Sequence, residues 1–438
     1  MRHVRSALCA SSFGLFVLAT VFGCGGTVPA EPGPGGGGAG GGTTNTGGGD
    51  ATGGGGSAPT DCTVVLQPSA DDTMTLQTAF AMAESNDVIC LAPGTYRPVA
   101  ELSLNKLGIT LKGIGATRED VVLDFANQVV DDDSMSVTSD GFTIEKLTIK
   151  NSPGNGIVVS GAEDVTFRDL KVSWDAGSVS TNGAYAVYPV SCTKVLIENC
   201  EVTGAADAGV YVGQSNQIIV RDNFVWGNVA GIEIENSTLS EVYNNEATDN
   251  TAGILVFVLP NLEKKDGETC NVHDNQVHNN NRENFAAGGV VGAVPVGIGI
   301  LVLAADGTEI HNNDIHDNHS TGIVVVAHET LEQLDSDFMS NDPMTDGFPQ
   351  TTFIYDNTFT NNGMDPALVL LALGYPTLPD IMWDGCEDMP NTAELCLGTT
   401  APTTFLDAGC NLTNMAQHST DATPFLCEHP KQPPVVLE

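Results

Sequence analysis

Two glutamates lie two residues apart in the phrase Gly231-Ile-Glu-Ile-Glu235, in which apolar and acidic residues alternate. In a β-strand the residues i and i+2 point to the same face, so Glu233 and Glu235 are expected to stand side by side, roughly 6–7 Å apart at their base. Paired carboxyl groups hydrolyse glycosides with retention at about 5–5.5 Å and with inversion at about 6.5–9.5 Å. The spacing is compatible with this chemistry, and we take Glu233 and Glu235 as candidate catalytic residues.

Tyrosine occupies the corresponding position in the two preceding phrases, Gly183-Ala-Tyr-Ala and Gly209-Val-Tyr-Val. The residues two and four after each glycine are expected to point outward, because side chains alternate between the faces of a strand. The first expected outward column is Val158, Tyr185, Tyr211, Glu233 and Leu255, and the second is Ser160, Val187, Gly213, Glu235 and Phe257. Two tyrosines and two glutamates thus share one exposed face, which suits a sugar because rings pack on sugar faces and carboxylates bind hydroxyls.

Loops 173–182 and 281–296 are expected to enter this face from one edge and to wall it as a groove. An alternative stays open, since exposed strands also carry Glu and Tyr for solubility and β-propensity. A lyase or epimerase is disfavoured, because the nearest cations, Arg168 and Arg221, are expected on another face. The candidate substrate-binding residues are Trp174, Tyr185, Tyr188, Asp207, Tyr211, Gln214 and Asn236.

Histidines recur in register in two later units and give a weaker candidate metal site. Stacked imidazoles with Asp274 or Asp317 nearby can bind a transition metal, although exposed histidines are also common in turns. The candidate ligands are the pairs His273 with His311 and His278 with His316. The run Asp131-Asp132-Asp133 could bind Ca²⁺ or form a solvated turn. No cofactor is certain from the sequence.

A repeat must position all these residues. The glycine phrase begins at Gly156, Gly183, Gly209, Gly231, Gly253, Gly297 and Gly322, with a shortest spacing of 22 residues. A second strand in each unit ends in an asparagine, and another asparagine follows five residues later. These two columns are Asn223, Asn245, Asn275, Asn313 and Asn357, and Asn228, Asn250, Asn280, Asn318 and Asn362. Asparagine tolerates the left-handed backbone of a tight turn, and stacked amides can bond along the stack.

The repeat therefore predicts an all-β fold, a single-stranded right-handed parallel β-helix. The phrase Asp87-Val-Ile-Cys-Leu-Ala-Pro-Gly-Thr-Tyr96 resembles the entry to many pectin-lyase-like β-helices. A short amphipathic helix over Thr75–Ser85 is expected to plug its open N-terminal end. The expected organisation is a signal peptide (1–23), a lipidated cysteine with a Gly-rich tether (24–60), the β-helix (61–365) and a cysteine-containing C-terminal cap (366–438). The polar, acidic loop 327–351 is expected to be a lid or a partner surface.

The N-terminus is typical of an export signal. Arg2 and Arg5 precede an apolar run, and Val21-Phe22-Gly23-Cys24 has the form of a lipobox, with Cys24 as the lipidated residue. The alternative is a plain signal peptide. Residues 25–60 have almost nothing to bury, so they form a tether that would hold the domain off a bacterial outer membrane. The formal net charge of −39 disfavours nucleic acid and polyanionic substrates such as pectate or alginate unless calcium bridges them.

Nine cysteines follow Cys24, and an oxidising compartment would allow disulfides. Sequence cannot prove the connectivity, but spacing suggests local pairs and leaves Cys270 over. The expected pairs are Cys62–Cys90, Cys192–Cys200, Cys386–Cys396 and Cys410–Cys427.

Several long phrases between Trp174 and Gly297 resemble a family of exported parallel β-helix repeat (lipo)proteins that has no settled activity. The matching words are Asn182-Gly-Ala-Tyr-Ala-Val-Tyr-Pro189, Asp207-Ala-Gly-Val-Tyr-Val-Gly-Gln-Ser215, Asn228-Val-Ala-Gly-Ile-Glu-Ile-Glu-Asn-Ser237, Leu255-Val-Phe-Val-Leu-Pro-Asn-Leu262 and Asn284-Phe-Ala. The resemblance covers most of residues 62–365. Members are commonly encoded beside a di-haem c-type cytochrome-like protein, so the resemblance implies a periplasmic or surface partner of that kind.

Three functions therefore compete at this point. The first is a cell-envelope lipoprotein that binds or processes a carbohydrate on the Tyr/Glu face. The second is a non-catalytic scaffold that docks a c-type cytochrome-like redox partner through its acidic surface. The third is a metal-handling periplasmic β-helix protein.

Overall fold

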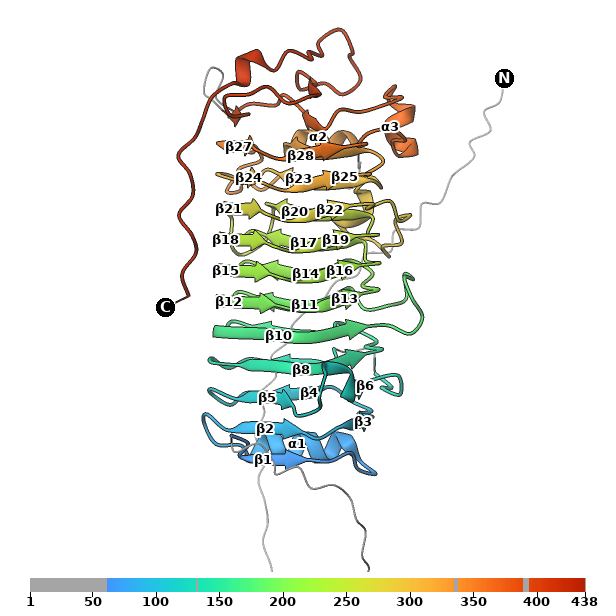
Figure 1. Cartoon of the computed structure of the whole chain (residues 1–438), viewed down its shortest axis with the longest axis vertical. Coiled ribbons are helices and arrows are strands. Elements are labelled where there is room, and N and C mark those ends of the chain that lie inside the picture. Colours follow the sequence, from blue (N-terminus) through green and yellow to red (C-terminus); the bar gives the residue numbers. More distant parts are fainter. Residues whose placement is uncertain (1–60, 131–132, 335–337, 389–393, 438) are drawn as a thin grey trace, which may run out of the picture. The chain divides into compact units, whose positions relative to one another are not determined.

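The chain winds into stacked coils of a right-handed parallel β-helix, as the repeat predicts (Figure 1). The computed structural model describes residues 61–130, 133–334, 338–388 and 394–437. The predicted signal peptide, Cys24 and the Gly-rich tether lie outside the described residues. Neighbouring coils pair in parallel, so each strand lies beside its equivalent in the next coil.

Each full coil contributes one strand to each of three faces, and two long strands, β8 and β10, run from the first face into the second. The first face contains β1 (Val64–Leu66), β2 (Val88–Leu91), β5 (Thr110–Gly113), β8 (Thr143–Lys150), β10 (Glu163–Ser173), β12 (Thr193–Glu198), β15 (Asn216–Arg221), β18 (Thr238–Tyr243), β21 (Glu268–His273), β24 (Glu309–His311), β27 (Thr352–Tyr355) and β30 (Leu395–Cys396). The second face adds β3 (Gly94–Tyr96), β6 (Val121–Asp124), β13 (Glu201–Thr203), β16 (Phe224–Trp226), β19 (Glu246–Thr248), β22 (Gln276–His278), β25 (Asp314–His316) and β28 (Thr358–Thr360). The third face contains β4 (Leu102–Leu104), β7 (Met135–Val137), β9 (Ile157–Ser160), β11 (Tyr185–Val190), β14 (Ala208–Gly213), β17 (Ala230–Glu235), β20 (Ala252–Phe257), β23 (Ile298–Leu303), β26 (Thr321–Val326), β29 (Ile381–Trp383) and β31 (Phe405–Asp407).

The two asparagine columns form buried ladders at the turns on either side of the second face. In one ladder, Nδ2 of Asn228 donates to Oδ1 of Asn250 at 3.1 Å, and Nδ2 of Asn250 donates to Oδ1 of Asn280 at 3.0 Å. The ladder that begins with Asn223 has the same pattern. Each Oδ1 also accepts the backbone N–H of the preceding asparagine, so the ladder satisfies backbone groups that the tight turn leaves unpaired.

The N-terminal end of the stack is covered by α1 (Asp72–Met82), which Figure 1 shows beside β1 and β2. The helix begins three residues before the predicted Thr75, because the Asp71 carboxylate accepts the backbone N–H of Met74 at 2.9 Å and caps the first turn. Leu76 and Phe80 are fully buried against the first coils. The helix therefore closes the apolar interior at this end, as predicted.

Three disulfides connect the described cysteines, and only the first matches the predicted pairing. Cys62–Cys90 ties the segment before β1 to β2. The four C-terminal cysteines pair across two neighbouring turns, as Cys386–Cys410 and Cys396–Cys427, so the two predicted local pairs are wrong. Each bond links cysteines in successive C-terminal turns. The cysteines that are closest in sequence are therefore not the ones that pair.

The predicted Cys192–Cys200 disulfide is also wrong, because the two residues occupy separate turns at opposite ends of β12. The backbone N–H of Cys200 donates to Oδ1 of Asn223, which places Cys200 at the head of an asparagine ladder. The backbone N–H of Cys192 donates to Oγ of Ser215 in a different column. Both are buried free thiols, as is Cys270.

We expect these three thiols to be alkylated only after unfolding. They are buried, and burial raises the pKa of Cys200 and Cys270 to about 12, so the reactive thiolate is scarce. Peptide mapping by mass spectrometry, with iodoacetamide added before or after denaturant, measures this directly. A crosslinked peptide containing both Cys192 and Cys200 would contradict the structure, and the three disulfide-linked peptides serve as the internal control.

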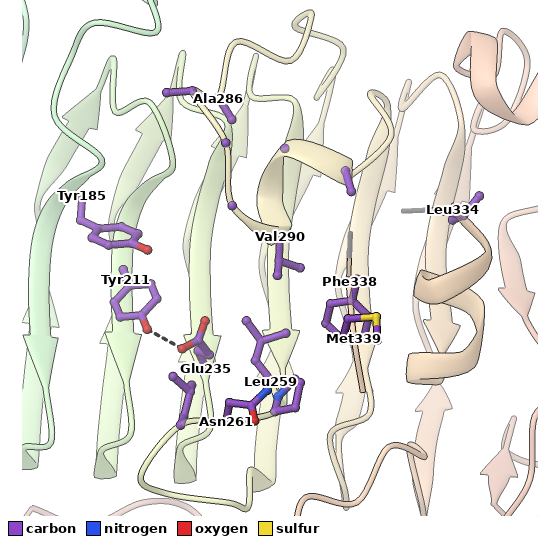
Figure 2. A pocket seen from close by; sticks show the side chains of 17 residues that line it. Tyr185, Tyr211, Glu235, Leu259, Asn261, Ala286, Val290, Leu334, Phe338 and Met339 are labelled. Atoms are coloured by element: carbon purple, nitrogen blue, oxygen red, sulfur yellow. Dashed lines mark hydrogen bonds between the residues drawn. The ribbon is translucent and has the colours of Figure 1, made fainter. Parts of the chain in front are cut away.

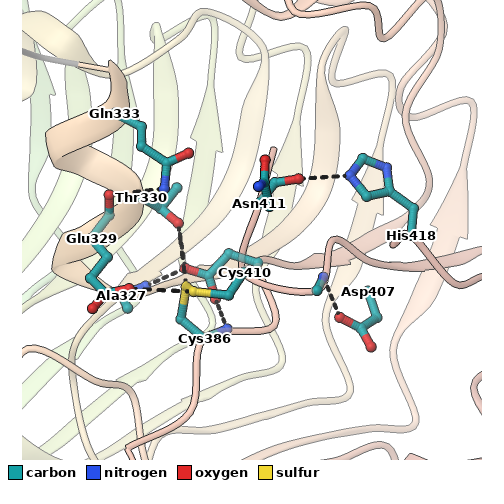
Figure 3. Close-up of a disulfide and its surroundings, with 11 residues drawn as sticks. Ala327, Glu329, Thr330, Gln333, Cys386, Asp407, Cys410, Asn411 and His418 are labelled. Carbon is teal, nitrogen blue, oxygen red and sulfur yellow. Dashed lines mark hydrogen bonds between the residues drawn. A yellow bond between two sulfur atoms is a disulfide. The ribbon is translucent and has the colours of Figure 1, made fainter. Parts of the chain in front are cut away.

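The stack continues beyond residue 365, since β29 pairs with β26, β30 with β27 and β31 with β29. The C-terminal part also contains α3 (Leu368–Ala372) and a short 3-10 helix, η3 (Thr423–Phe425), and η1 (Arg118–Asp120) lies in the N-terminal half. The Cys386–Cys410 disulfide lies against α2 (His328–Leu334), as Figure 3 shows. The buried Asp384 carboxylate accepts the backbone N–H of Ala327 at 2.7 Å and the hydroxyl of Thr330 at 2.6 Å, which fixes the start of α2.

The last residues run back along the first face toward the middle of the stack (Figure 1). The backbone N–H of Gln432 donates to Glu309, and that of Val435 donates to Glu241, two coils away. The ammonium of Lys431 lies 4.4 Å from the ring centroid of Tyr355. Within the described part of the chain, no helix has the length and apolar character needed to cross a bilayer.

Candidate functional site

The third face carries the residues that the sequence singled out, with one shift of register. Tyr211 pairs with Glu233 and Gly213 with Glu235, as predicted. In the preceding coil, however, Val187 pairs with Val210, so Tyr188 rather than Tyr185 stands beside Tyr211. Relative to its strand, the glycine phrase at Gly183 begins three residues earlier than the phrase at Gly209. The predicted outward columns are therefore wrong for this coil.

Three coil insertions cover this face. The distance in sequence between successive ladder asparagines is 22 residues from Asn223 to Asn245 and then rises to 30, 38 and 44 in the next three coils. The extra residues form the loop after β20, the loop before β23 that contains η2 (Val290–Ala293), and the segment after β26 that contains α2. The loops after β20 and β26 stand at one edge of the third face, and the loop before β23 stands at the other.

An open cavity of about 1000 Å³ lies between these insertions and β11, β14 and β17 (Figure 2). Its floor carries Tyr185, Tyr211 and Glu235. Its walls are Leu259, Pro260, Asn261, Leu262, Ala286, Ala287, Gly288, Gly289, Val290, Gly292, Ala293, Leu334, Phe338 and Met339. Of the two loops predicted as walls, 281–296 takes this role, whereas 173–182 contributes no lining residue. Loop 327–351, predicted to be a lid or a partner surface, contributes Leu334, Phe338 and Met339 to the lining.

The glutamate pair is buried rather than exposed. Only 3% of Glu233 and 6% of Glu235 is accessible, because the insertions cover the strand face. Tyr211 donates its hydroxyl to Oε1 of Glu235 at 2.6 Å (Figure 2). The Glu233 carboxyl also hydrogen-bonds to Glu235, so the two carboxyls converge, and the side-by-side separation expected for a hydrolase pair is not found.

Burial and mutual repulsion set the protonation of this cluster. Burial, with the nearby charges of Asp207 and Glu235, raises the pKa of Glu233 well above its usual value. Burial raises the pKa of Asp207 to about 7, with a contribution from the charge of Glu235. Burial also raises the pKa of Glu235, but hydrogen bonds from Tyr211 and Glu233 oppose this effect. Of the two glutamates, Glu233 therefore holds its proton more tightly, and it donates this proton to Glu235.

Three tyrosines pack together beside the carboxyls. The ring centroids of Tyr185 and Tyr211 are 4.3 Å apart, and Tyr188 meets Tyr211 edge-on at 4.9 Å. Tyr185 also hydrogen-bonds to Asp207. Burial raises the pKa of all three hydroxyls, so they remain neutral hydrogen-bond donors at physiological pH.

Three other predicted substrate-binding residues have structural roles. Oε1 of Gln214 accepts the backbone N–H groups of Glu263 and Lys264 at 3.0 and 3.1 Å. Asn236 is fully buried and bonds to Leu259 in the same loop, so both residues hold the cavity wall after β20. Trp174 is buried in the interior and donates its indole N–H to the carbonyl of Ser152, away from the cavity.

The histidine pairs are stacked in a way that does not suit a shared metal. His273 and His311 lie 5.0 Å apart with 3° between their planes, and His278 and His316 lie 4.7 Å apart with 2° between theirs. A metal ion binds close to the plane of each imidazole at about 2.0–2.1 Å from nitrogen, so two parallel stacked rings cannot both hold one ion. The first pair instead continues the stack of Tyr243 and Tyr355 rings on the first face.

Acidic residues lie near possible metal ligands at two other places in the chain. Glu329 lies close to Cys386 and Cys410, but these cysteines form a disulfide and offer no thiolate (Figure 3). Asp131 and Asp132 of the predicted calcium run lie outside the described residues, and Oδ1 of Asp133 accepts the backbone N–H of Asn155.

Arg168 and Arg221 lie on the first face, as predicted, and both bond to Glu198.

Comparison with known proteins agrees with this architecture. A family model described as a right-handed beta helix region matches residues 134–298. The A-module of mannuronan C-5 epimerase AlgE4 from Azotobacter vinelandii superposes with a TM-score of 0.54 at 16% identity, over 75% of this chain and 90% of that one. These comparisons show that the chain has the right-handed parallel β-helix fold.

Other solved structures resemble this β-helix protein more weakly. The A-module of the AlgE6 epimerase of the same organism gives a TM-score of 0.49 at 16% identity, over 72% of this chain and 86% of that one. An exopolygalacturonase from Thermotoga maritima gives 0.38 at 13% identity, over 69% and 89%. Identities this low show the fold alone. No curated protein sequence matches the β-helix protein.

Proposed function

We propose that this β-helix protein is an exported envelope protein that binds a saccharide without acidic groups in the third-face cavity and cleaves it by acid–base catalysis. The observation that carries the proposal is the cavity floor, where Tyr185 and Tyr211 lie beside Glu235, with Asp207 hydrogen-bonded to Tyr185. Tyrosine rings offer stacking surfaces for sugar rings, and carboxyls bind hydroxyls and transfer protons. The name of the mannuronan C-5 epimerase that shares the fold agrees with a saccharide ligand.

The protonation of the cluster suggests separate roles. Asp207, with a pKa of about 7, carries a transferable proton near neutral pH and would act as the general acid. Glu235 accepts hydrogen bonds from Tyr211 and Glu233, which favour its carboxylate form, and it would act as the base that activates water. Glu233 does not line the cavity and would position Glu235. The predicted pair of catalytic glutamates thus becomes Glu235 with Asp207.

The absence of a cation disfavours acidic sugars. None of the described residues that line the cavity is a lysine or arginine. A uronate chain would therefore bring its carboxylates against Glu235 and Asp207 without compensation. The disulfides fit an oxidising, extracytoplasmic compartment. Lipid attachment at Cys24 and a c-type cytochrome-like partner remain predictions.

A glycan array probed with the purified mature protein tests the proposal, followed by turnover assays on the glycans that bind. We expect neutral or basic glycans to bind and uronates not to bind. Glu235→Gln is expected to lower kcat by about 10²-fold or more while binding persists, because it removes the base and keeps the shape. The matched control is Glu246→Gln on the second face, which should leave turnover unchanged. Binding of uronates alone, or full turnover by Glu235→Gln, would refute the proposal.

A further inference from the structure

The cavity floor carries negative charge that the protein does not neutralise. Asp207, Glu233 and Glu235 lie together with three tyrosines, and the groups that act on their pKa values include no cation. Buried carboxyls are normally paired with a cation, because transfer of their charge out of water is costly. The same chain makes such pairs elsewhere. Glu198, which is 7% exposed, bonds to both Arg168 and Arg221.

One carboxylate oxygen of this cluster has no hydrogen-bond partner. Oε2 of Glu233 is fully buried and unpaired among the described residues, although the residue is only 3% exposed. More than nine in ten buried polar groups in proteins have a partner, so an unpaired carboxyl oxygen next to the cavity residue Glu235 indicates a missing partner. The expected donor is positively charged, because three carboxyls share the site.

The arrangement suits an organic cation better than a metal ion. The oxygens of Asp207, Glu233 and Glu235 do not all lie within 4.8 Å of one another, as the ligands of one bound ion would. Tyrosine rings lie alongside, and the centroid of Tyr185 is 4.3 Å from that of Tyr211. Ammonium groups bind well to combinations of aromatic faces and carboxylates.

We propose that the ligand of this cavity is an amino sugar, whose ammonium group binds at the Asp207, Glu233 and Glu235 carboxyls beside the tyrosine rings. The inference rests on the proposed saccharide function and names its substrate class. A glucosamine unit places one ammonium among neutral hydroxyls, so it offers the missing donors and the missing charge together.

The proposal implies that binding displaces protons. Glu233 holds a proton in the free protein because of burial and like charge, and an ammonium group would replace it, whereas Asp207 keeps the proton that it donates in catalysis. The tyrosines that face these carboxyls, Tyr185, Tyr188 and Tyr211, stay neutral, and Asp133 is the other acid that acts on Tyr188. Affinity for an ammonium sugar should therefore rise with pH, as Glu233 gives up its proton more readily.

The test uses two tetrasaccharides that differ only at C2. Glucosamine tetramer carries an ammonium group there, and cellotetraose carries a hydroxyl. Isothermal titration calorimetry with the mature protein at pH 7, in two buffers of different ionisation enthalpy, gives the affinity and the number of protons released. We expect glucosamine tetramer to bind at least about tenfold more tightly than cellotetraose, with proton release only for the former. Glu233→Gln and Asp207→Asn should each reduce this preference, whereas Glu246→Gln should preserve it.

The possible outcomes separate the inference from the function on which it rests. Equal binding of both tetrasaccharides, lost in Tyr211→Ala, would overturn the ammonium site and leave the saccharide function standing. Binding of neither would overturn both. A titration with CaCl₂ alone tests whether a metal ion, rather than an ammonium group, supplies the positive charge at this cluster. Saturable Ca²⁺ binding that Glu233→Gln removes would show that the cluster is a metal site and would overturn the inference.

Discussion

Replacement of Asn250 by alanine is expected to lower the free energy of unfolding by about 3–5 kcal/mol. The side chain is fully buried and makes four hydrogen bonds. Its Nδ2 donates to the carbonyl of Val225 and to Asn280, and its Oδ1 accepts the backbone N–H and the Nδ2 of Asn228. Alanine would remove all four and leave their buried partners unsatisfied.

Urea unfolding followed by circular dichroism measures this loss as a shift of the transition midpoint. The control is Gln276→Ala, an exposed position on β22 in the next coil, which should change stability by no more than about 0.5 kcal/mol. A midpoint for Asn250→Ala equal to that of the control would show that the ladder does not hold the coils together.

The protein is expected to be more stable at pH 5 than at pH 8, with a melting temperature roughly 5–10 °C higher. Burial raises the pKa of Asp207 and Asp306 to about 7 and that of Asp384 to about 6. An acid whose pKa is raised by folding binds its proton more tightly in the folded state. Stability is therefore full at a pH below the unfolded pKa, near 4, and is lost as the pH rises through the folded pKa values.

Differential scanning calorimetry across pH 4–9 tests this profile, and Asp384→Asn provides a matched variant. The asparagine keeps an acceptor for Ala327 and Thr330 but cannot ionise, so part of the decline between pH 4 and 6 should disappear. Its amide NH2 then faces the backbone N–H of Cys386, so the melting temperature should be lower at every pH while its dependence on pH becomes weaker. A melting temperature that rises from pH 5 to pH 8 would contradict the raised pKa values.

The fold could be predicted because its determinants recur along the sequence. A buried asparagine is tolerated only where its amide is satisfied, and two columns of them in constant relation to apolar strands are compatible with few structures other than a stacked coil. The capping helix was predicted for the same reason, since an apolar stack needs a closed end. Its first residue was misplaced because Asp71 was not recognised as the cap.

The candidate site was predicted in its residues but not in its geometry. Tyr211, Glu233 and Glu235 follow the repeat and lie where alternation places them. Tyr185 does not, because the strand in its coil is shifted by three residues relative to the glycine phrase, and the phrase alone gives no sign of this shift. The burial of Glu233 depends on insertions such as 281–296 and 327–351, whose conformation follows no periodicity. The disulfide between Cys386 and Cys410 also depends on which turns become neighbours.

The growth in coil length from 22 to 30, 38 and 44 residues has an evolutionary consequence. The ladders and the strands specify the coil, and the inserted segments specify the cavity. Insertions and deletions in these segments can therefore alter ligand specificity while the asparagine columns remain in register. Descendants of such a protein can diverge in what they recognise without a change in the scaffold that they inherit.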